Sequence, residues 1–221
     1  FDSSQEPLIQ GFSMPDITLY IIMSFVTNLL TRSDSSFMIG KGVKDGSIIM
    51  RLLRPVHFSA SYLFTELGSK WLIFISVGLP FLNVIILMKI LSGQGIVEVL
   101  GLTILYLFSL TLAYLINFSL ISALVLQPLC LKIFGSNLLK TSIVAFMSGS
   151  LIPLAFFPKV VSAILSLLSF SSLIYTPVMI IVGKYDASQM LQALLLQFFG
   201  LLVMVGLVSV DLETIQSFIT I

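Results

Sequence analysis

Charged side chains and cysteine are scarce in this sequence of 221 residues. Asp, Glu, Lys and Arg make up 10% of it, against about 25% in a soluble domain, and 57% of the residues are hydrophobic. The single cysteine, Cys130, excludes an intrachain disulfide and a cysteine metal cluster. A net charge of +1 from scattered residues excludes a basic stripe that follows nucleic-acid phosphates. The composition indicates an integral membrane protein with no nucleic-acid partner.

The groups needed for catalysis are also lacking. The sequence has one histidine, His57, and no carboxylate well inside an apolar interval. No Ser–His–Asp, paired-carboxylate or metal-ligand constellation is present, so a general base is missing and we expect a non-catalytic subunit. The lack of carboxylates inside the apolar intervals also argues against a proton- or sodium-coupled transporter, which needs an ionisable relay in the membrane.

The glycines of Gly-Lys-Gly-Val-Lys-Asp-Gly-Ser, residues 40–47, do not form a phosphate-binding loop. That loop has two glycines five positions apart, with Lys and Ser or Thr directly after the second. Asp45 stands where the second glycine is required. We therefore expect no cofactor on this chain, and any ATP and Mg²⁺ to be bound by a partner ATPase.

Charge-free intervals divide the chain into candidate membrane helices. They cover residues 17–31, 71–88, 99–131, 141–158, 160–183 and 187–210. About 20 apolar residues cross about 30 Å of hydrocarbon, and an ionised side chain in that layer costs several kcal/mol. The pattern predicts an all-α polytopic helical bundle with five visible spans.

Two helix boundaries can be predicted from capping and proline. Ser13 and Asp16 form a capping box around Pro15, so the first helix begins before Ile17. The interval 99–131 is too long for one perpendicular span, and we expect its helix to end near Pro128.

The interval 160–183 has two interpretations. It is rich in serine, and Pro153, Pro158 and Pro177 interrupt the region. It is either an ordinary span or a re-entrant pair of short helices, which requires burial in protein or a wet cavity. We favour re-entrant helices because the prolines break the region at several points, and the ordinary span stays open.

The distribution of Lys and Arg predicts the orientation. If the first span enters the cytoplasm, eight cations lie inside: Arg32, Lys41, Lys44, Arg51, Arg54, Lys70, Lys132 and Lys140. Three lie outside: Lys89, Lys159 and Lys184. The carboxyl end then returns to the cytoplasm.

The basic interruption at residues 40–55 is expected to contain a short amphipathic helix. Ser33 or Asp34 caps a helix that runs to Asp45, and Gly46 suits the left-handed residue that ends it. Met38, Ile39 and Val43 lie roughly on one face, opposite Lys41 and Lys44. A second short element covers residues 47–54. The segment is either an interfacial helix with snorkelling cations or a docking piece for a cytoplasmic subunit.

Polar residues inside the apolar intervals are expected to bond neighbouring helices. These residues are Asn83, Asn117, Gln127, Gln192 and Gln197. Glu66 and Lys70, four positions apart, are expected to pair on the helix that leads into the membrane at Trp71.

Five short motifs carry a family resemblance. They are Asp-Gly-Ser-Ile…Leu-Leu-Arg-Pro at 45–55, Glu-Leu-Gly at 66–68, Gly-Leu-Pro at 78–80, Ser-Gly-Ser-Leu-Ile-Pro-Leu-Ala-Phe-Phe-Pro at 148–158, and Ile-Tyr-Thr-Pro at 174–177. In this order they resemble the permease subunits of type-2 ABC exporters. More narrowly, the chain resembles a bacterial branch whose permeases occur as adjacent pairs beside an ATPase.

The resemblance implies one transmembrane permease domain over residues 1–221, with a cytoplasmic coupling segment at 32–70 and an extracellular-side re-entrant region at 150–184. It implies six membrane helices, with one span before Phe1. The expected ATPase-coupling residues are Lys41, Val43, Lys44, Asp45, Gly46, Ile48, Arg51, Arg54 and Pro55. The expected re-entrant or gate residues are Ser148, Gly149, Pro153, Phe156, Phe157, Pro158 and Pro177.

The function implied is that of a permease subunit in an ATP-driven exporter of the bacterial inner membrane. The expected partners are an ABC ATPase subunit, a second permease copy or paralogue, and membrane lipid. The substrate is expected to be an amphipathic drug, peptide or lipid-like molecule. The alternative is a non-transporting scaffold or sensor subunit that docks a cytoplasmic partner through the same basic segment.

Overall fold

The computed structural model describes residues 14–47, 50, 58–126, 142, 144–150, 158, 164–165 and 170–219. Its main elements are α1 (Met14–Thr31), α2 (Ser35–Lys44), α4 (Phe58–Ile73), the π-helix η1 (Phe74–Gly78), α5 (Leu79–Leu91), α6 (Ile96–Leu126), α9 (Tyr175–Val182) and α10 (Ala187–Ile219). No β-strand occurs in the described part of the chain. The predicted all-α fold is confirmed.

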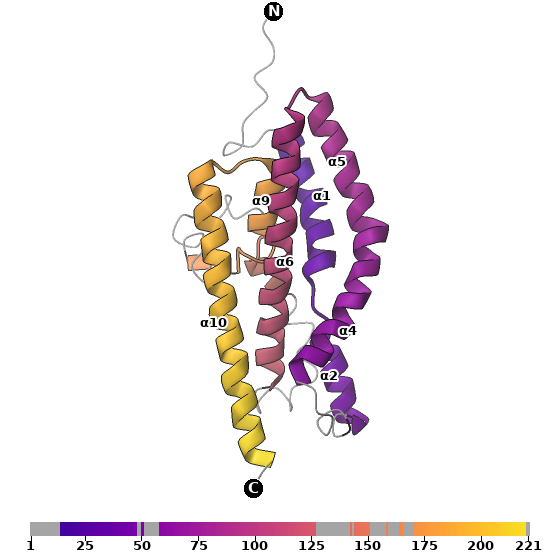
Figure 1. The fold of residues 1–221 in the computed structure, drawn as a ribbon, viewed down its shortest axis with the longest axis vertical. Coiled ribbons are helices and arrows are strands. Elements are labelled where there is room, and N and C mark those ends of the chain that lie inside the picture. Colours follow the sequence, from indigo (N-terminus) through magenta and orange to yellow (C-terminus); the bar gives the residue numbers. More distant parts are fainter. Residues whose placement is uncertain are drawn as a thin grey trace, which may run out of the picture.

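Four helices are long and apolar enough to cross a membrane: Met14–Thr31, Ala60–Leu91, Ile96–Ala123 and Ala187–Ser209. They lie along the long axis of the molecule (Figure 1). They match four of the five expected spans. The fifth, at 141–158, falls largely outside the described residues.

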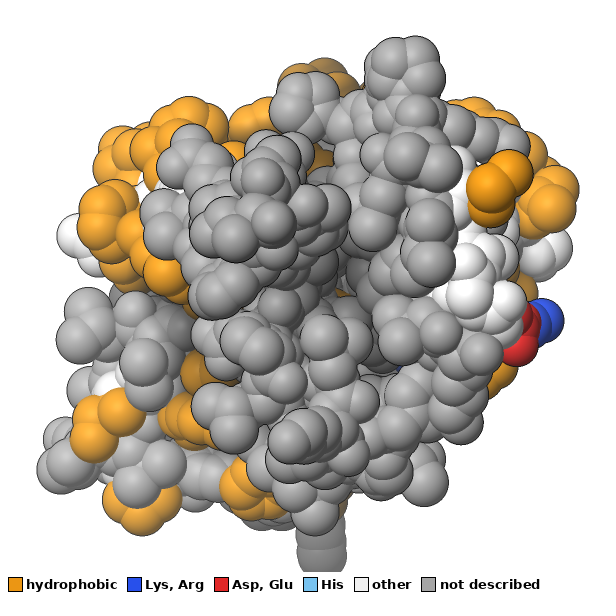
Figure 2. All heavy atoms as spheres, turned by 90° about the horizontal axis from the view of Figure 1, so that it is seen from below, with side chains coloured by type: hydrophobic (Ala, Val, Ile, Leu, Met, Phe, Trp, Pro, Cys, Tyr) orange, Lys and Arg blue, Asp and Glu red, His pale blue; other side chains and the backbone are white. Residues whose placement is uncertain are grey.

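α1, α6 and α10 run in one direction along this axis, and the span formed by α4, η1 and α5 runs in the other (Figure 1). One end of the molecule carries α2 and the C-terminal ends of α6 and α10. The other end carries the start of α1 and the α5–α6 and α9–α10 connections. Seen from the α2 end, hydrophobic side chains lie around the described periphery (Figure 2), as expected of a surface that faces lipid.

The predicted start of the first helix agrees with the structure. α1 begins at Met14, three residues before the charge-free interval, with Pro15 in its first turn. α6 reaches Leu126, and the residues that follow it lie outside the described part, so its end near Pro128 stays a prediction. α10 differs, since it continues past Asp211 to Ile219 instead of ending near residue 210. A charge marks where the apolar span ends, but it does not stop a helix.

A π-helix interrupts the second span. The N–H of Leu79 donates to the carbonyl of Phe74, five residues earlier, and Pro80 follows at the start of α5. Proline has no N–H for the regular ladder, and local π-adjustments satisfy backbone groups around such sites. The hydroxyl of Ser76 also donates to the carbonyl of Leu72, at 2.8 Å. The helix therefore continues across the membrane with one widened turn.

The core lies between α1, α6 and α9. Tyr20 and Met23 of α1, Tyr106 of α6 and Val178 of α9 are completely buried. Seven of the eight residues of α9 are buried, whereas α10 exposes a row of large hydrophobic side chains to the outside. α9 is thus an internal helix surrounded by longer ones.

α9 is only about 12 Å long, since an α-helix rises 1.5 Å per residue, and cannot cross about 30 Å of hydrocarbon alone. It ends at Gly183, which has a φ of +81°. Pro177 lies in its first turn and does not break it, because first-turn N–H groups have no partner within a helix. Residues 160–163 and 166–169 lie outside the described part, so the re-entrant path stays a prediction.

Candidate functional site

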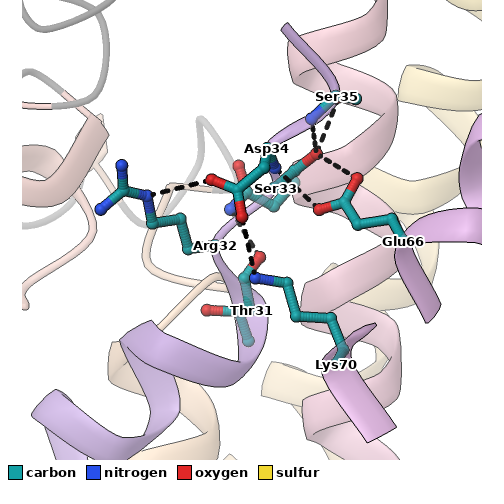
Figure 3. Close-up of polar contacts among 8 residues, drawn as sticks. Thr31, Arg32, Ser33, Asp34, Ser35, Glu66 and Lys70 are labelled. Carbon is teal, nitrogen blue, oxygen red and sulfur yellow. Dashed lines mark hydrogen bonds and ion pairs between the residues drawn. The ribbon is translucent and has the colours of Figure 1, made fainter. Parts of the chain in front are cut away.

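A polar corner joins α1, α2 and α4 at the end of the molecule that carries α2 (Figure 3). We use this name for Arg32, Ser33, Asp34, Ser35, Glu66 and Lys70. Four of these residues form the short connection that follows α1 and the start of α2, and two project from α4. The corner therefore lies at the base of the predicted coupling segment.

Glu66 is the centre of the corner. Its side chain is only 2% exposed, and its two oxygens accept hydrogen bonds from the backbone N–H of Asp34 at 2.8 Å and from the hydroxyl of Ser33 at 3.0 Å. Ser33 in turn lies 2.8 Å from the hydroxyl of Ser35. A buried carboxylate that accepts two hydrogen bonds holds the connection after α1 firmly against α4, because removing the carboxylate leaves both donors unpaired.

Lys70 pairs with Asp34 and not with Glu66, which corrects the expected i, i+4 pair. Its ammonium nitrogen lies 3.5 Å from Oδ2 of Asp34, and Nε of Arg32 lies 3.6 Å from the other carboxylate oxygen. Helical spacing alone brings Glu66 and Lys70 onto one face of α4. The tertiary fold supplies Glu66 with donors from another element and offers Lys70 the carboxylate of Asp34.

α2 forms where the sequence predicts it. The carbonyl of Asp34 accepts from the N–H groups of Phe37 and Met38 at 3.1 Å, and the turn after Lys44 contains Gly46 with a φ of +70°. Position 34 thus begins the helix through its backbone, while its side chain makes the ion pairs. The predicted helix and its glycine end are confirmed.

Met38 packs α2 onto two spans. Met38 is partly buried against Tyr62 of α4 and Phe118 of α6. Lys41, about one turn after Met38, is exposed. α2 is therefore attached to two spans and also presents an exposed lysine.

The other predicted coupling residues are only partly described. Asp45 and Gly46 are exposed at the end of α2. Val43 and Lys44 belong to α2, but their side chains lie outside the described part. Ile48, Arg51, Arg54 and Pro55 lie outside the described residues.

A polar face of α1 holds the 144–150 segment. The hydroxyl of Tyr20 donates to the carbonyl of Gly149 at 2.6 Å, and the amide of Asn28 donates to the hydroxyl of Ser150 at 3.1 Å. The carbonyl of Ser148 accepts from the N–H of Tyr175, at the start of α9, at 3.2 Å. Ser148 and Gly149, predicted from the sequence, are thus brought together with α1 and α9.

The other predicted gate residues are not seen at this contact in the described part of the chain. Pro158 is exposed and Pro177 is buried in α9. Pro153, Phe156 and Phe157 lie outside the described residues.

Sequence reasoning missed Tyr20 and Asn28. The signal was present, because the polar residues of α1 at 20, 24, 27, 28 and 31 recur at helical spacing and share one face. These positions are all buried or half-buried. A polar stripe on an apolar span indicates protein contact instead of lipid contact.

Two of the five polar residues expected to bond neighbouring helices do so. The amide of Asn117 on α6 donates to the carbonyl of Thr31 on α1 at 2.8 Å. Gln197 on α10 accepts from Ser109 at 2.8 Å and donates to the carbonyl of Ser172 at 2.7 Å. Asn83 and Gln192 are exposed, and Gln127 lies outside the described residues.

A small polar cavity adjoins the corner. Its volume is about 60 Å³, and its polar lining includes Asn28, Arg32, Asn117 and Ser148. This volume suits a few water molecules and is far below the about 300–1,000 Å³ of a drug-sized site. The cavity lies at the junction of α1, α6 and the 144–150 segment.

The opposite end of the molecule is held by two lysines. Nζ of Lys184 lies 2.6 Å from Oδ2 of Asp16, which ties the α9–α10 connection to the start of α1. Nζ of Lys89 donates to the carbonyl of Val182 at the C-terminal end of α9, at 3.3 Å, where a cation is favoured by the helix dipole. Within the described residues, no group of three or more His, Cys, Asp or Glu side chains could hold a metal ion.

Long apolar helices arranged in this way define an all-α, multi-pass membrane protein. The chain belongs to the ABC-2 family of transporters, because the family model described as "ABC-2 family transporter protein" matches residues 3–213. It is accordingly the permease subunit of an ABC transporter, a membrane subunit that is generally non-catalytic. Neither the curated proteins nor the solved structures contain a match to it.

Proposed function

We propose that this permease exports an amphipathic drug, peptide or lipid-like molecule across the inner membrane of a bacterium. A separate ABC ATPase binds ATP with Mg²⁺, and α2 with the segment that follows it is the surface on which the ATPase acts. The observation that carries this proposal is the double attachment of α2. Its start is fixed to α4 through Glu66 and Lys70, and Met38 packs against both α4 and α6.

The coupling works by rigid displacement. A push on the exposed face around Lys41 moves α2, and the corner and Met38 pass the movement to two membrane spans. The amide of Asn117 links α6 to the last carbonyl of α1, so α1 is expected to move together with α4 and α6. ATP shifts the resulting equilibrium only if the ATPase binds one arrangement of the spans more tightly than the other, by about 5 kcal/mol for a nearly complete switch.

The transport path is formed with a second permease, either another copy or a related chain. The polar cavity of about 60 Å³ is too small to hold a drug-sized molecule. The exposed apolar surfaces of α5 and α10 supply area for contact with lipid and with such a partner.

The α2 end faces the cytoplasm in this proposal. Eight of the eleven Lys and Arg residues are assigned to that side by the order of the spans, as the positive-inside tendency favours. A cysteine introduced at Ser47 should therefore be inaccessible to an impermeant thiol reagent added to intact cells, in a Cys130→Ser background. Labelling from outside would mean that the α2 end faces the outside of the cell, opposite to this proposal.

The ATPase contact is tested by charge reversal at the exposed Lys41 of α2. Lys41→Glu is expected to reduce co-purification of the ATPase and ATP-dependent efflux together, whereas Gln94→Glu at the opposite end, also exposed, should change neither. Retained ATPase binding with no efflux of any amphipathic substrate, even in the unmodified complex, would favour the scaffold or sensor function instead.

A further inference from the structure

A second concave feature lies on the lipid-facing side of the molecule and is not used by the coupling mechanism. It is an apolar groove of about 510 Å³ between α4–η1 and α6, with Leu30 of α1 at its base. We call it the lateral groove. Its volume falls in the range of sites for small organic ligands, and it is more than eight times that of the polar cavity.

The walls of the lateral groove are almost wholly apolar. Trp71 and Phe74 form one side, with their rings stacked 5.7 Å apart. Leu107, Leu110 and Leu115 form the other side. Trp71 is 63% exposed, so the groove opens where this part of the chain meets lipid.

Tyr114 and Lys70 bring hydrogen-bond donors to this apolar lining, whereas the hydroxyl of Thr111 already donates to the carbonyl of Phe108. The side chain of Tyr114 is 94% buried, since only 6% of it is exposed, yet its hydroxyl has no hydrogen-bond partner among the described residues. Lys70 is the second donor. Its ammonium group has three N–H donors, and its contact with Asp34 at 3.5 Å leaves donors to spare. An unpaired buried hydroxyl is costly unless a ligand accepts from it.

The length of the groove matches one leaflet of the bilayer. Its α6 wall runs from Leu107 to Leu115, which is about 12 Å at 1.5 Å per residue. Half of the hydrocarbon thickness is about 15 Å. Lys70 and Trp71 are the residue types that mark the membrane–water boundary, and they lie at the end nearest the polar corner.

We propose that the lateral groove binds one phospholipid of the leaflet on the α2 side. An acyl chain fills the apolar walls, and a phosphate oxygen accepts hydrogen bonds from the Tyr114 hydroxyl and from Lys70. This proposal does not depend on the direction of transport. Since Lys70 belongs to both the groove and the polar corner, the bound lipid contacts the element that fixes α2.

The test uses the single tryptophan of the chain, Trp71, as the reporter. The full chain in a maltoside detergent is titrated with phosphatidylglycerol that carries brominated acyl chains, which quench tryptophan fluorescence on contact. A groove site gives quenching that saturates at about one lipid per chain. Brominated diacylglycerol, which has the same tails but no phosphate, should require about a tenfold higher concentration, as expected for the loss of a hydrogen bond to a charged group.

The variant Tyr114→Phe distinguishes phosphate binding by the Tyr114 hydroxyl from a purely structural role of that hydroxyl. If the hydroxyl binds phosphate, the variant should lower the affinity for phosphatidylglycerol about tenfold and leave that for diacylglycerol unchanged. Tyr62→Phe is the matched control, because Tyr62 is a buried tyrosine beside Phe118, as Tyr114 is, but does not line the groove. Thr111→Phe, which fills the groove, should abolish saturation, whereas Ile104→Phe on the exposed part of the same helix should not.

Three results would overturn the proposal. Quenching that rises in proportion to lipid without saturation would mean ordinary surface contact. Equal affinities for the Tyr114→Phe and Tyr62→Phe variants would remove the phosphate contact. Protection of Trp71 from brominated lipid at every concentration would assign the groove to a protein segment, such as a second copy of the chain.

Discussion

The buried carboxylate of Glu66 on α4 accepts a 2.8 Å hydrogen bond from the backbone N–H of Asp34, which lies 32 residues earlier in the chain. The connection between α1 and α2 is thereby attached to the start of the second span. A movement of α2 that breaks this bond leaves both a buried carboxylate and a backbone donor unpaired. The two elements are therefore expected to move together.

Replacing Glu66 should uncouple α2 from α4. Glu66→Ala removes the acceptor for Asp34 and Ser33, and we expect a loss of about 1–3 kcal/mol in stability together with a loss of ATP-driven transport. Glu66→Gln keeps one carbonyl acceptor and a group that can donate to Ser33, so it should retain most of both. Thermal unfolding and efflux are the two measurements.

The matched control is Glu98→Ala. Glu98 lies in the first turn of α6 and is exposed, so its removal should alter stability by less than about 0.5 kcal/mol. If Glu66→Ala unfolds at the same temperature as Glu98→Ala, the corner does not hold the elements together.

Met38 should be more important for coupling than its larger neighbour Phe37. Met38→Ala removes the contact of α2 with Tyr62 and Phe118, and we expect ATP-driven efflux to fall while the ATPase still binds. Phe37 is 63% exposed, so Phe37→Ala should leave efflux near its original level. ATPase co-purification and efflux rates distinguish the two variants. The opposite order would mean that α2 transmits motion through its exposed face.

The sequence was sufficient for the local features of α2. The start of α2 follows Ser33, whose hydroxyl accepts a hydrogen bond from the N–H of Ser35 at 3.3 Å, and its end has Gly46 with a positive φ. Both residue types are common at these positions. The apolar spans could likewise be predicted, because a low-dielectric layer excludes charge along the whole helix.

Long-range partners could not be predicted in the same way. Spacing on one helix suggested that Glu66 pairs with Lys70, but donors from the 33–35 connection compete for the carboxylate. The bond from Tyr20 to Gly149 joins residues 129 positions apart, and no local pattern specifies that distance. The π-helix at 74–78 also escaped prediction, since Pro80 alone does not determine how the preceding turn adjusts.

Gly78 permits a close contact between η1 and α1. A Cβ at this position would lie 3.0 Å from the ring of Phe74 and 3.3 Å from Cδ1 of Leu30. Gly78→Ala is therefore expected to destabilise the protein by about 1–3 kcal/mol and to displace Phe74, a wall residue of the lateral groove. Gly101→Ala on α6, where a Cβ meets nothing within 4 Å, should be neutral or slightly stabilising. Thermal unfolding of the two variants in the same detergent compares them directly.

Tyr20 should hold the 144–150 segment against α1 through one hydroxyl. Tyr20→Phe keeps the buried ring and removes the 2.6 Å bond to the carbonyl of Gly149, so we expect a loss of about 1–2 kcal/mol and faster hydrogen exchange at residues 144–150. Thr18→Ala is the control, because the exposed Thr18 hydroxyl donates to the carbonyl of Met14 within α1, away from the 144–150 segment. Its effect should stay within α1. If both variants change exchange in the 144–150 segment equally, the segment is held by packing and not by the tyrosine hydroxyl.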